Sequence, residues 1–192
     1  MRQITKNHYG KGYPMKWWGL SVLGILLLGF TTACEDQEND PRDPVTQQDM
    51  DFAVDATYSN LSEIEFGQLA VEKAEYESVR DFGVLMVTDH TNAQNQLATI
   101  AEIQDIEVPD TLKAEHQLLY DQLLAMEGEA FDSAYIRSQI EAHQQAQQIF
   151  QTQIEEGSYK QLLDFASSTL PHINAHLERA MELKDELMPE DE

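Results

Sequence analysis

The segment from residue 82 to residue 100 constrains the fold most strongly, because its apolar residues recur at helical spacing. Residues three or four positions apart lie on the same face of a helix. One histidine falls on this apolar face, and a titratable ring there predicts a polar site inside the core. The face consists of Phe82, Met86, His90, Ala93, Leu97 and Ile100.

Capping residues and chain breakers predict where the helices begin and end. Thr46 with Asp49, and Ser78 with Asp81, have the spacing of capping boxes at the starts of two long helices. After a break at Pro109, capping residues and stop signals predict three more helices: Asp110 caps a short one that Gly128 ends, Gly157 ends the next, and Ser158 with Gln161 opens the last. The predicted helices cover 46–75, 78–103, 112–126, 131–155 and 158–187.

Four long helices with a shorter one in the middle predict an all-α four-helix bundle. The segment between the second and third long helices is long enough to return the chain along the bundle as a helical crossover. We expect one bundle domain over residues 46–187, followed by an acidic tail at 188–192.

The N-terminus predicts export and lipid anchoring. Residues 1–33 carry four basic residues and then the apolar run 17–30, which is too short for a bilayer span but typical of a signal peptide. The chain's only cysteine, Cys34, follows small residues and resembles the lipidated cysteine of a bacterial lipobox. Residues 34–45 would then be a disordered acidic tether from a membrane of the cell envelope, expected to be the outer membrane, on its periplasmic or surface face. A secreted protein and an uncleaved anchor are the alternatives.

Charge excludes one class of partner. The chain has 35 acidic and 12 basic residues, a net charge of −23, and removal of the leader would leave −27. Such a negative field opposes binding to nucleic acid. The sequence also lacks a nucleophile elbow and a glycine-rich phosphate loop, so we expect no enzyme activity.

Counting from the predicted turns places four polar side chains at one level of the bundle. Glu63 lies 14 residues before Glu77 and His90 lies 13 after it, so they are level on antiparallel helices. His143 lies 14 residues before Gly157, and His172 and His176 follow that glycine by 15 and 19 residues. If the two hairpins pack in register, Glu63, His90, His143 and one of His172 or His176 converge.

These residues also carry a family resemblance. The segments EIEFGQLAVEKA, VTDHTNAQNQL, AFDSAYIRSQIEAHQQAQQIF and FASSTLPHINAHLERA resemble the domain of unknown function 4142 family. The resemblance implies a ferritin-like bundle in an exported or outer-membrane bacterial protein, with no established activity. It favours His176 over His172. The matching positions are Glu63, His90, Phe131, Asp132, Tyr135, His143, Leu170, Pro171 and His176.

Two functions remain open from the sequence. The first is a structural or interaction module in which Glu63 and the histidines form a buried hydrogen-bonded network. The alternative is a site for zinc, copper or iron built from Glu63, His90, His143 and His176. Asp132, Tyr135 and His172 would be outer partners or alternative ligands. A di-iron centre is disfavoured, because no long helix carries the Glu-x-x-His pair of such centres.

Overall fold

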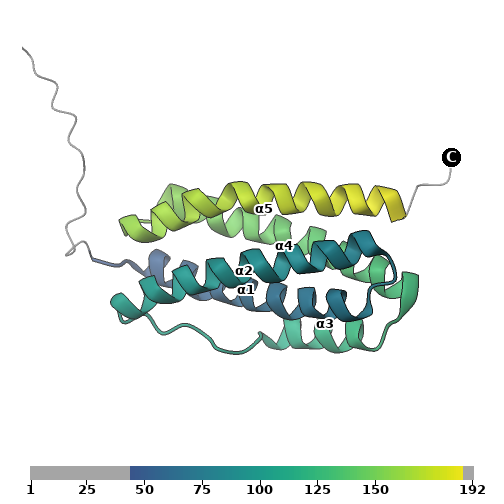
Figure 1. The fold of residues 1–192 in the computed structure, drawn as a ribbon. Helices are drawn as coiled ribbons and strands as arrows, with labels where there is room; N and C mark the ends of the chain where they lie inside the picture. The colour runs from purple at the N-terminus through teal and green to yellow at the C-terminus, as the bar shows by residue number, and fades with distance from the viewer. Residues whose placement is uncertain (1–43, 188–192) are drawn as a thin grey trace, which may run out of the picture. The chain divides into compact units, whose positions relative to one another are not determined.

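The structure is a computed structural model that describes residues 44–187, all within one compact unit. Every regular element in this range is a helix. The elements are α1 (Gln47–Lys73), α2 (Glu77–Ile103), α3 (Ala114–Leu124), α4 (Gly128–Glu156) and α5 (Lys160–Leu187), shown in Figure 1.

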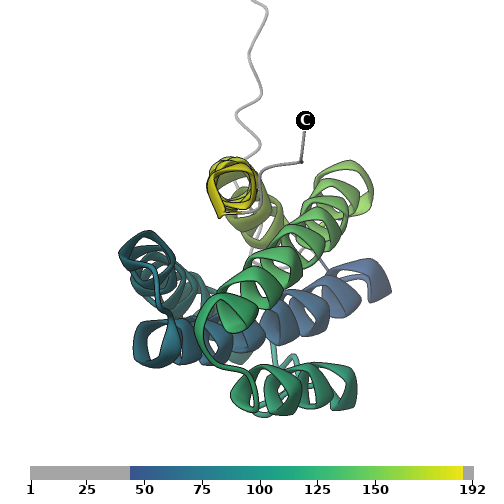
Figure 2. The same cartoon turned by 90° about the vertical axis from the view of Figure 1, so that its right-hand side faces the viewer.

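The four long helices form two antiparallel hairpins, α1–α2 and α4–α5, which pack on one another (Figures 1 and 2). The short helix α3 lies outside the four, against α1 and α4, within the crossover that joins the hairpins. The predicted all-α four-helix bundle with a helical crossover is therefore confirmed. A single long crossover is the connection used by ferritin-like bundles.

All five predicted helix starts lie within three residues of the observed ones, but among the predicted capping boxes only that of α1 is found in the structure. Thr46 caps α1, and its hydroxyl and the Asp49 carboxylate form a complete capping box. Ser78 caps nothing, since α2 begins at Glu77 after Tyr76. The short helix begins four residues after Asp110. Gly128, predicted to end α3, is instead the first residue of α4 at a φ of 61° that suits glycine.

Two buried aspartates explain how the hairpin turns manage without local caps. Asp132, near the start of α4, accepts hydrogen bonds from the backbone N–H groups of Glu75 (3.2 Å) and Tyr76 (2.8 Å) in the α1–α2 turn. Asp49, near the start of α1, accepts from the N–H groups of Ser158 (3.1 Å) and Tyr159 (3.2 Å) in the α4–α5 turn. Each hairpin therefore supplies the acceptor for the turn of the other.

The apolar core consists of two clusters at opposite ends of the bundle. One is built around Phe52, Phe150 and Phe165, whose ring centroids lie 5.0 to 6.2 Å apart. The other contains Phe131 and Tyr135, with parallel rings 5.9 Å apart. On each long helix, a buried polar stretch separates the residues of the first cluster from those of the second. This polar layer contains the candidate site.

Helices α1 and α2 approach closely at a pair of glycines near the polar layer. A Cβ atom added at Gly83 would lie 2.8 Å from the carbonyl oxygen of Gly67, and one added at Gly67 would lie 2.9 Å from that of Gly83. The absence of side chains at both positions is what allows the two backbones to touch.

Several predictions fall outside the described residues: the signal peptide 1–33, lipidation at Cys34, most of the tether 34–45 and the tail 188–192. Within residues 44–187, none of the helices combines the length and apolar character that a membrane span requires.

Candidate metal site

Three buried imidazoles meet in the polar layer. His90 of α2, His143 of α4 and His176 of α5, called here the histidine trio, have exposed fractions of 5, 1 and 4 %. Their ring centroids lie 5.4 to 5.7 Å apart. One ring nitrogen from each lies within 4.8 Å of the corresponding nitrogens of the other two. Two hairpins thus contribute to one small group, with α2 from the first and α4 and α5 from the second.

Hydrogen bonds to the outer side of each ring determine where its proton lies. Nδ1 of His143 lies 2.9 Å from the backbone oxygen of Gln139, which can only accept, so this nitrogen carries the hydrogen. Nε2 of His176 likewise donates to the Asp89 carboxylate at 3.0 Å. Both histidines therefore keep a lone pair on the other ring nitrogen.

His90 also donates a hydrogen bond from its outer ring nitrogen, in this case to a side-chain amide. Its Nδ1 lies 3.0 Å from Oδ1 of Asn60, while the Asn60 amide donates to the side chain of Gln94 at 3.3 Å. This second bond orients the Asn60 oxygen toward the imidazole, so Nδ1 of His90 is the donor. Its lone pair is on Nε2.

The three remaining nitrogens, Nε2 of His90, Nε2 of His143 and Nδ1 of His176, are buried and have no hydrogen-bond partner in the part of the chain that the structure describes. Burial keeps all three rings neutral. It lowers the pKa of His143 to about 4 and that of His90 well below 6.5, with further lowering at His90 from the other two rings. Burial also lowers the pKa of His176, although the Asp89 carboxylate opposes this. At neutral pH the trio therefore presents three uncharged imidazoles, each with a lone pair that could bind a metal ion.

The spacing of the trio's ring nitrogens, one from each histidine, suits a small cation. Three atoms within 4.8 Å of one another share a point at most about 2.8 Å from each, whereas zinc–imidazole bonds are about 2.0–2.1 Å long. Binding would therefore draw each ring inward by no more than about 0.7 Å. Metal-bound histidines usually bind the ion with one ring nitrogen and donate the hydrogen of the other to a carboxylate or a carbonyl oxygen.

Glu63 lies in the polar layer but outside this group. Its side chain is 1 % exposed, and neither carboxylate oxygen has a hydrogen-bond partner within residues 44–187. Burial raises the pKa of Glu63 to about 8, and the nearby Gln139 amide opposes this rise without reaching hydrogen-bond geometry. The Tyr135 hydroxyl is also buried and unpartnered, and burial followed by the Glu63 charge raises its pKa. Glu63 is thus protonated at neutral pH.

The other predicted residues lie elsewhere. Asp132, expected as an outer partner of the site, instead holds the α1–α2 turn. His172 is exposed and does not belong to the buried trio. Sequence reasoning missed Asn60, Asp89 and Gln139 as partners of the imidazoles. Asn60 could have been found, because it lies on the inward face of α1 one turn before Glu63.

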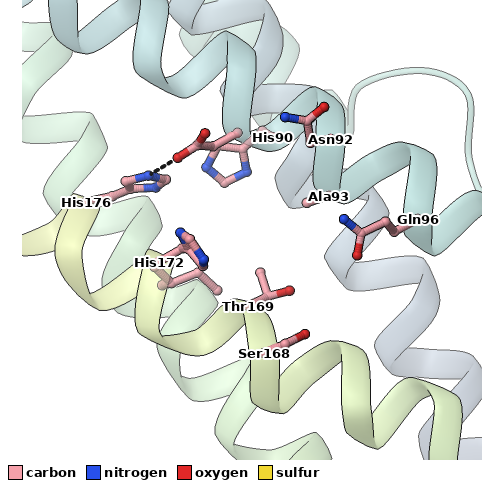
Figure 3. A pocket seen from close by; sticks show the side chains of 10 residues that line it. His90, Asn92, Ala93, Gln96, Ser168, Thr169, His172 and His176 are labelled. Atoms are coloured by element: carbon pink, nitrogen blue, oxygen red, sulfur yellow. Dashed lines mark hydrogen bonds and ion pairs between the residues drawn. The ribbon is translucent and has the colours of Figure 1, made fainter.

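A cleft of about 300 Å³ between α2 and α5 leads to the trio (Figure 3). His90 and His176 form part of its wall, and the further polar side chains that line it are those of Asp89, Asn92, Gln96, Ser168, Thr169 and His172. We call it the α2–α5 cleft. His143 lies behind it, on α4.

Solved structures with the same fold come from another family of unknown function. A DUF305 fragment from Deinococcus radiodurans has a TM-score of 0.66 at 12 % identity, and the match covers 73 % of this chain and 97 % of that one. A DUF305 protein from Streptomyces coelicolor, predicted to be secreted, has a TM-score of 0.64 at 13 % identity, covering 73 % and 91 %. At these identities the likeness concerns the fold.

Sequence comparison gives one further result. No curated protein matches the chain. Residues 34–183 match the family described as Domain of unknown function (DUF4142), which confirms the resemblance found in the sequence.

Proposed function

Because this chain belongs to the DUF4142 family, whose description assigns no activity, we propose a function from the site itself: the bundle binds one late first-row transition-metal ion through the histidine trio. Two observations carry the proposal: one nitrogen from each of the three buried rings lies within 4.8 Å of the others, and each ring keeps one buried nitrogen without a hydrogen-bond partner among the described residues.

These unpartnered atoms also weigh against the structural network expected as the first hypothesis. A network that specifies register gains its stability from satisfied hydrogen bonds, and an unsatisfied buried polar atom costs about 1–3 kcal/mol. The trio satisfies only its outer nitrogens. A metal ion would satisfy the three inner nitrogens together.

The donor set narrows the metal. Three imidazoles without a thiolate suit Zn²⁺, Cu²⁺ and Ni²⁺, whereas Mg²⁺ and Ca²⁺ prefer oxygen ligands. Three protein ligands also leave at least one coordination position for water or another ligand. Glu63, an expected ligand, is not part of this set, since its oxygens lie outside the group.

Metal binding can be measured directly on the full-length chain in a mild detergent. After incubation with Zn²⁺, Cu²⁺ or Ni²⁺ and gel filtration, mass spectrometry should find one metal ion per chain. At a metal concentration 100 times the dissociation constant, the free energy of unfolding should rise by about 2.7 kcal/mol. Less than a tenth of an equivalent of every metal, with no thermal shift, would refute the proposal.

Matched variants locate the binding site. His90→Ala, His143→Ala and His176→Ala should each remove stoichiometric binding, while His116→Ala, which changes a half-buried histidine on α3, should retain it. Asp89→Ala should weaken affinity about 10- to 100-fold, because it removes the acceptor that orients His176. Equal binding by all variants would place the metal somewhere else.

We also propose that the protein is exported and held in the cell envelope by lipid on Cys34. The basic and apolar leader before that cysteine supports this, and the fold is shared with a protein predicted to be secreted. In a bacterial expression host, Cys34→Ala should move the protein from the membrane fraction to the soluble fraction. Retention in the membrane would favour an uncleaved anchor.

A further inference from the structure

We propose that His172 is the entry ligand for the histidine trio: a metal ion entering the α2–α5 cleft binds His172 first and then passes to the buried site. This inference rests on the proposed metal binding and adds the route and the residue that control exchange. The metal would be exchanged with the surroundings through this cleft.

The position of His172 supports this role. His172 and His176 lie four residues apart on α5, a spacing that places side chains on one helix face about 5–6 Å apart at Cβ. The two are close enough that the charge of His172 contributes to lowering the pKa of His176. His172 is exposed, His176 is buried, and both line the cleft (Figure 3). The pair therefore spans the distance from solvent to the trio.

Physical chemistry explains why such a residue is needed. A hydrated divalent ion loses favourable interactions with water when it enters a buried site, and this cost must be offset by new ligands along the way. At each step one metal–nitrogen bond forms and one bound water molecule leaves. An imidazole on the cleft wall replaces the first water before the ion reaches the trio.

The other polar groups of the cleft favour a cation. The Asp89 side chain is 33 % exposed, so its carboxylate attracts cations while it holds the Nε2–H of His176. Asn92, Gln96, Ser168 and Thr169 offer further oxygen atoms on both walls. Among residues 44–187, no lysine or arginine lines the cleft.

The test is kinetic, on full-length chain in detergent. Zn²⁺ is supplied as a complex with a coloured chelator, and its transfer to the protein is followed by stopped-flow absorbance; release to excess EDTA is followed separately. His172→Ala should retain one equivalent of Zn²⁺ and an unchanged dissociation constant. Its association and release should both be about 10-fold slower than in the wild type.

A second pair of variants tests the route. Ser168→Phe narrows the cleft and should slow both rates, whereas Ser167→Phe, an exposed neighbour outside the cleft lining, should leave them unchanged. Unchanged rates in His172→Ala and Ser168→Phe would overturn the inference while metal binding stands. Faster release with weaker affinity in His172→Ala would overturn it too, since His172 would then be a permanent ligand. If the wild type binds no metal, both proposals fail.

Discussion

Replacing Glu63 by glutamine should stabilise the protein, because the wild-type carboxyl group must give up its charge in order to be buried. The pKa of Glu63 rises from 4.5 to about 8 on folding. Between these values the folded state binds the proton and the unfolded state does not, so stability falls as pH rises through this window. Glutamine has nearly the same shape and stays neutral in both states.

The size of the effect follows from the pKa difference. One pKa unit corresponds to 1.36 kcal/mol, so the carboxyl destabilises the fold by about 3 kcal/mol at pH 7 and by about 5 kcal/mol above pH 8. Below pH 4.5 the difference between the wild type and Glu63→Gln should vanish. The difference cancels the contributions of other titrating groups, which are the same in both proteins.

Urea unfolding followed by circular dichroism at pH 4.5, 7 and 9, with EDTA present, measures this difference. Glu65→Gln is the matched control, since Glu65 is exposed on the same helix and should change stability by less than about 0.5 kcal/mol. The reasoning is wrong if Glu63→Gln and the wild type show the same free energy of unfolding at pH 9, or if their difference does not depend on pH.

Three further perturbations test the packing and charge of the bundle. Asp49→Ala leaves the side-chain amide of Gln153 and the N–H groups of Ser158 and Tyr159 without their acceptor, and should cost about 3 kcal/mol or more in a urea titration; a loss below 1 kcal/mol would contradict its role in the turn. Gly83→Ala places a methyl group 2.8 Å from the Gly67 carbonyl oxygen and should cost about 1–3 kcal/mol, against a near-neutral Val84→Ala at the exposed neighbouring position. In the metal-free Glu63→Gln protein, stability should rise by at least about 3 kcal/mol between pH 4 and pH 6.5, because the unfolded state binds the His143 proton in that window and the folded state does not, and the lowered pKa values of His90 and His176 act in the same direction; a flat profile would show that the buried imidazoles are not neutral.

The bundle and the level of the site could be predicted from sequence because both depend on spacing. Apolar residues at helical intervals fix which face of each helix is buried, and counting from a short turn fixes which residues are level on antiparallel neighbours. His90, His143 and His176 lie on inward faces at one level for this reason. The count could not place Glu63 relative to the imidazoles, since a difference of one turn decides which side chains touch.

The helix caps and the hydrogen-bond partners of the imidazoles could not be predicted, because they depend on contacts between residues far apart in the chain. Ser78 matches a helix cap as well as Thr46 does, but α2 begins one residue before it, directly after Tyr76, whose N–H is bound by Asp132, 56 residues later. The groups that hydrogen-bond to the outer nitrogens of the trio could not be predicted for a similar reason. Asp89 adjoins His90 in sequence yet serves His176 on another helix, and the acceptor for His143 is a backbone carbonyl, which leaves no trace in the sequence.

Asp49 and Asp132, which each bind the turn of the other hairpin, have a consequence for how the bundle unfolds. Because each hairpin holds the turn of the other, the amides of Tyr76 and Tyr159 lose their acceptors only when the hairpins separate. Their hydrogen exchange should therefore follow the opening of the whole bundle, although both amides lie in turns, where exchange is usually fast. A metal ion on His90, His143 and His176 would join the same two hairpins at mid-length. Loading the site should then slow exchange at both distant turns together.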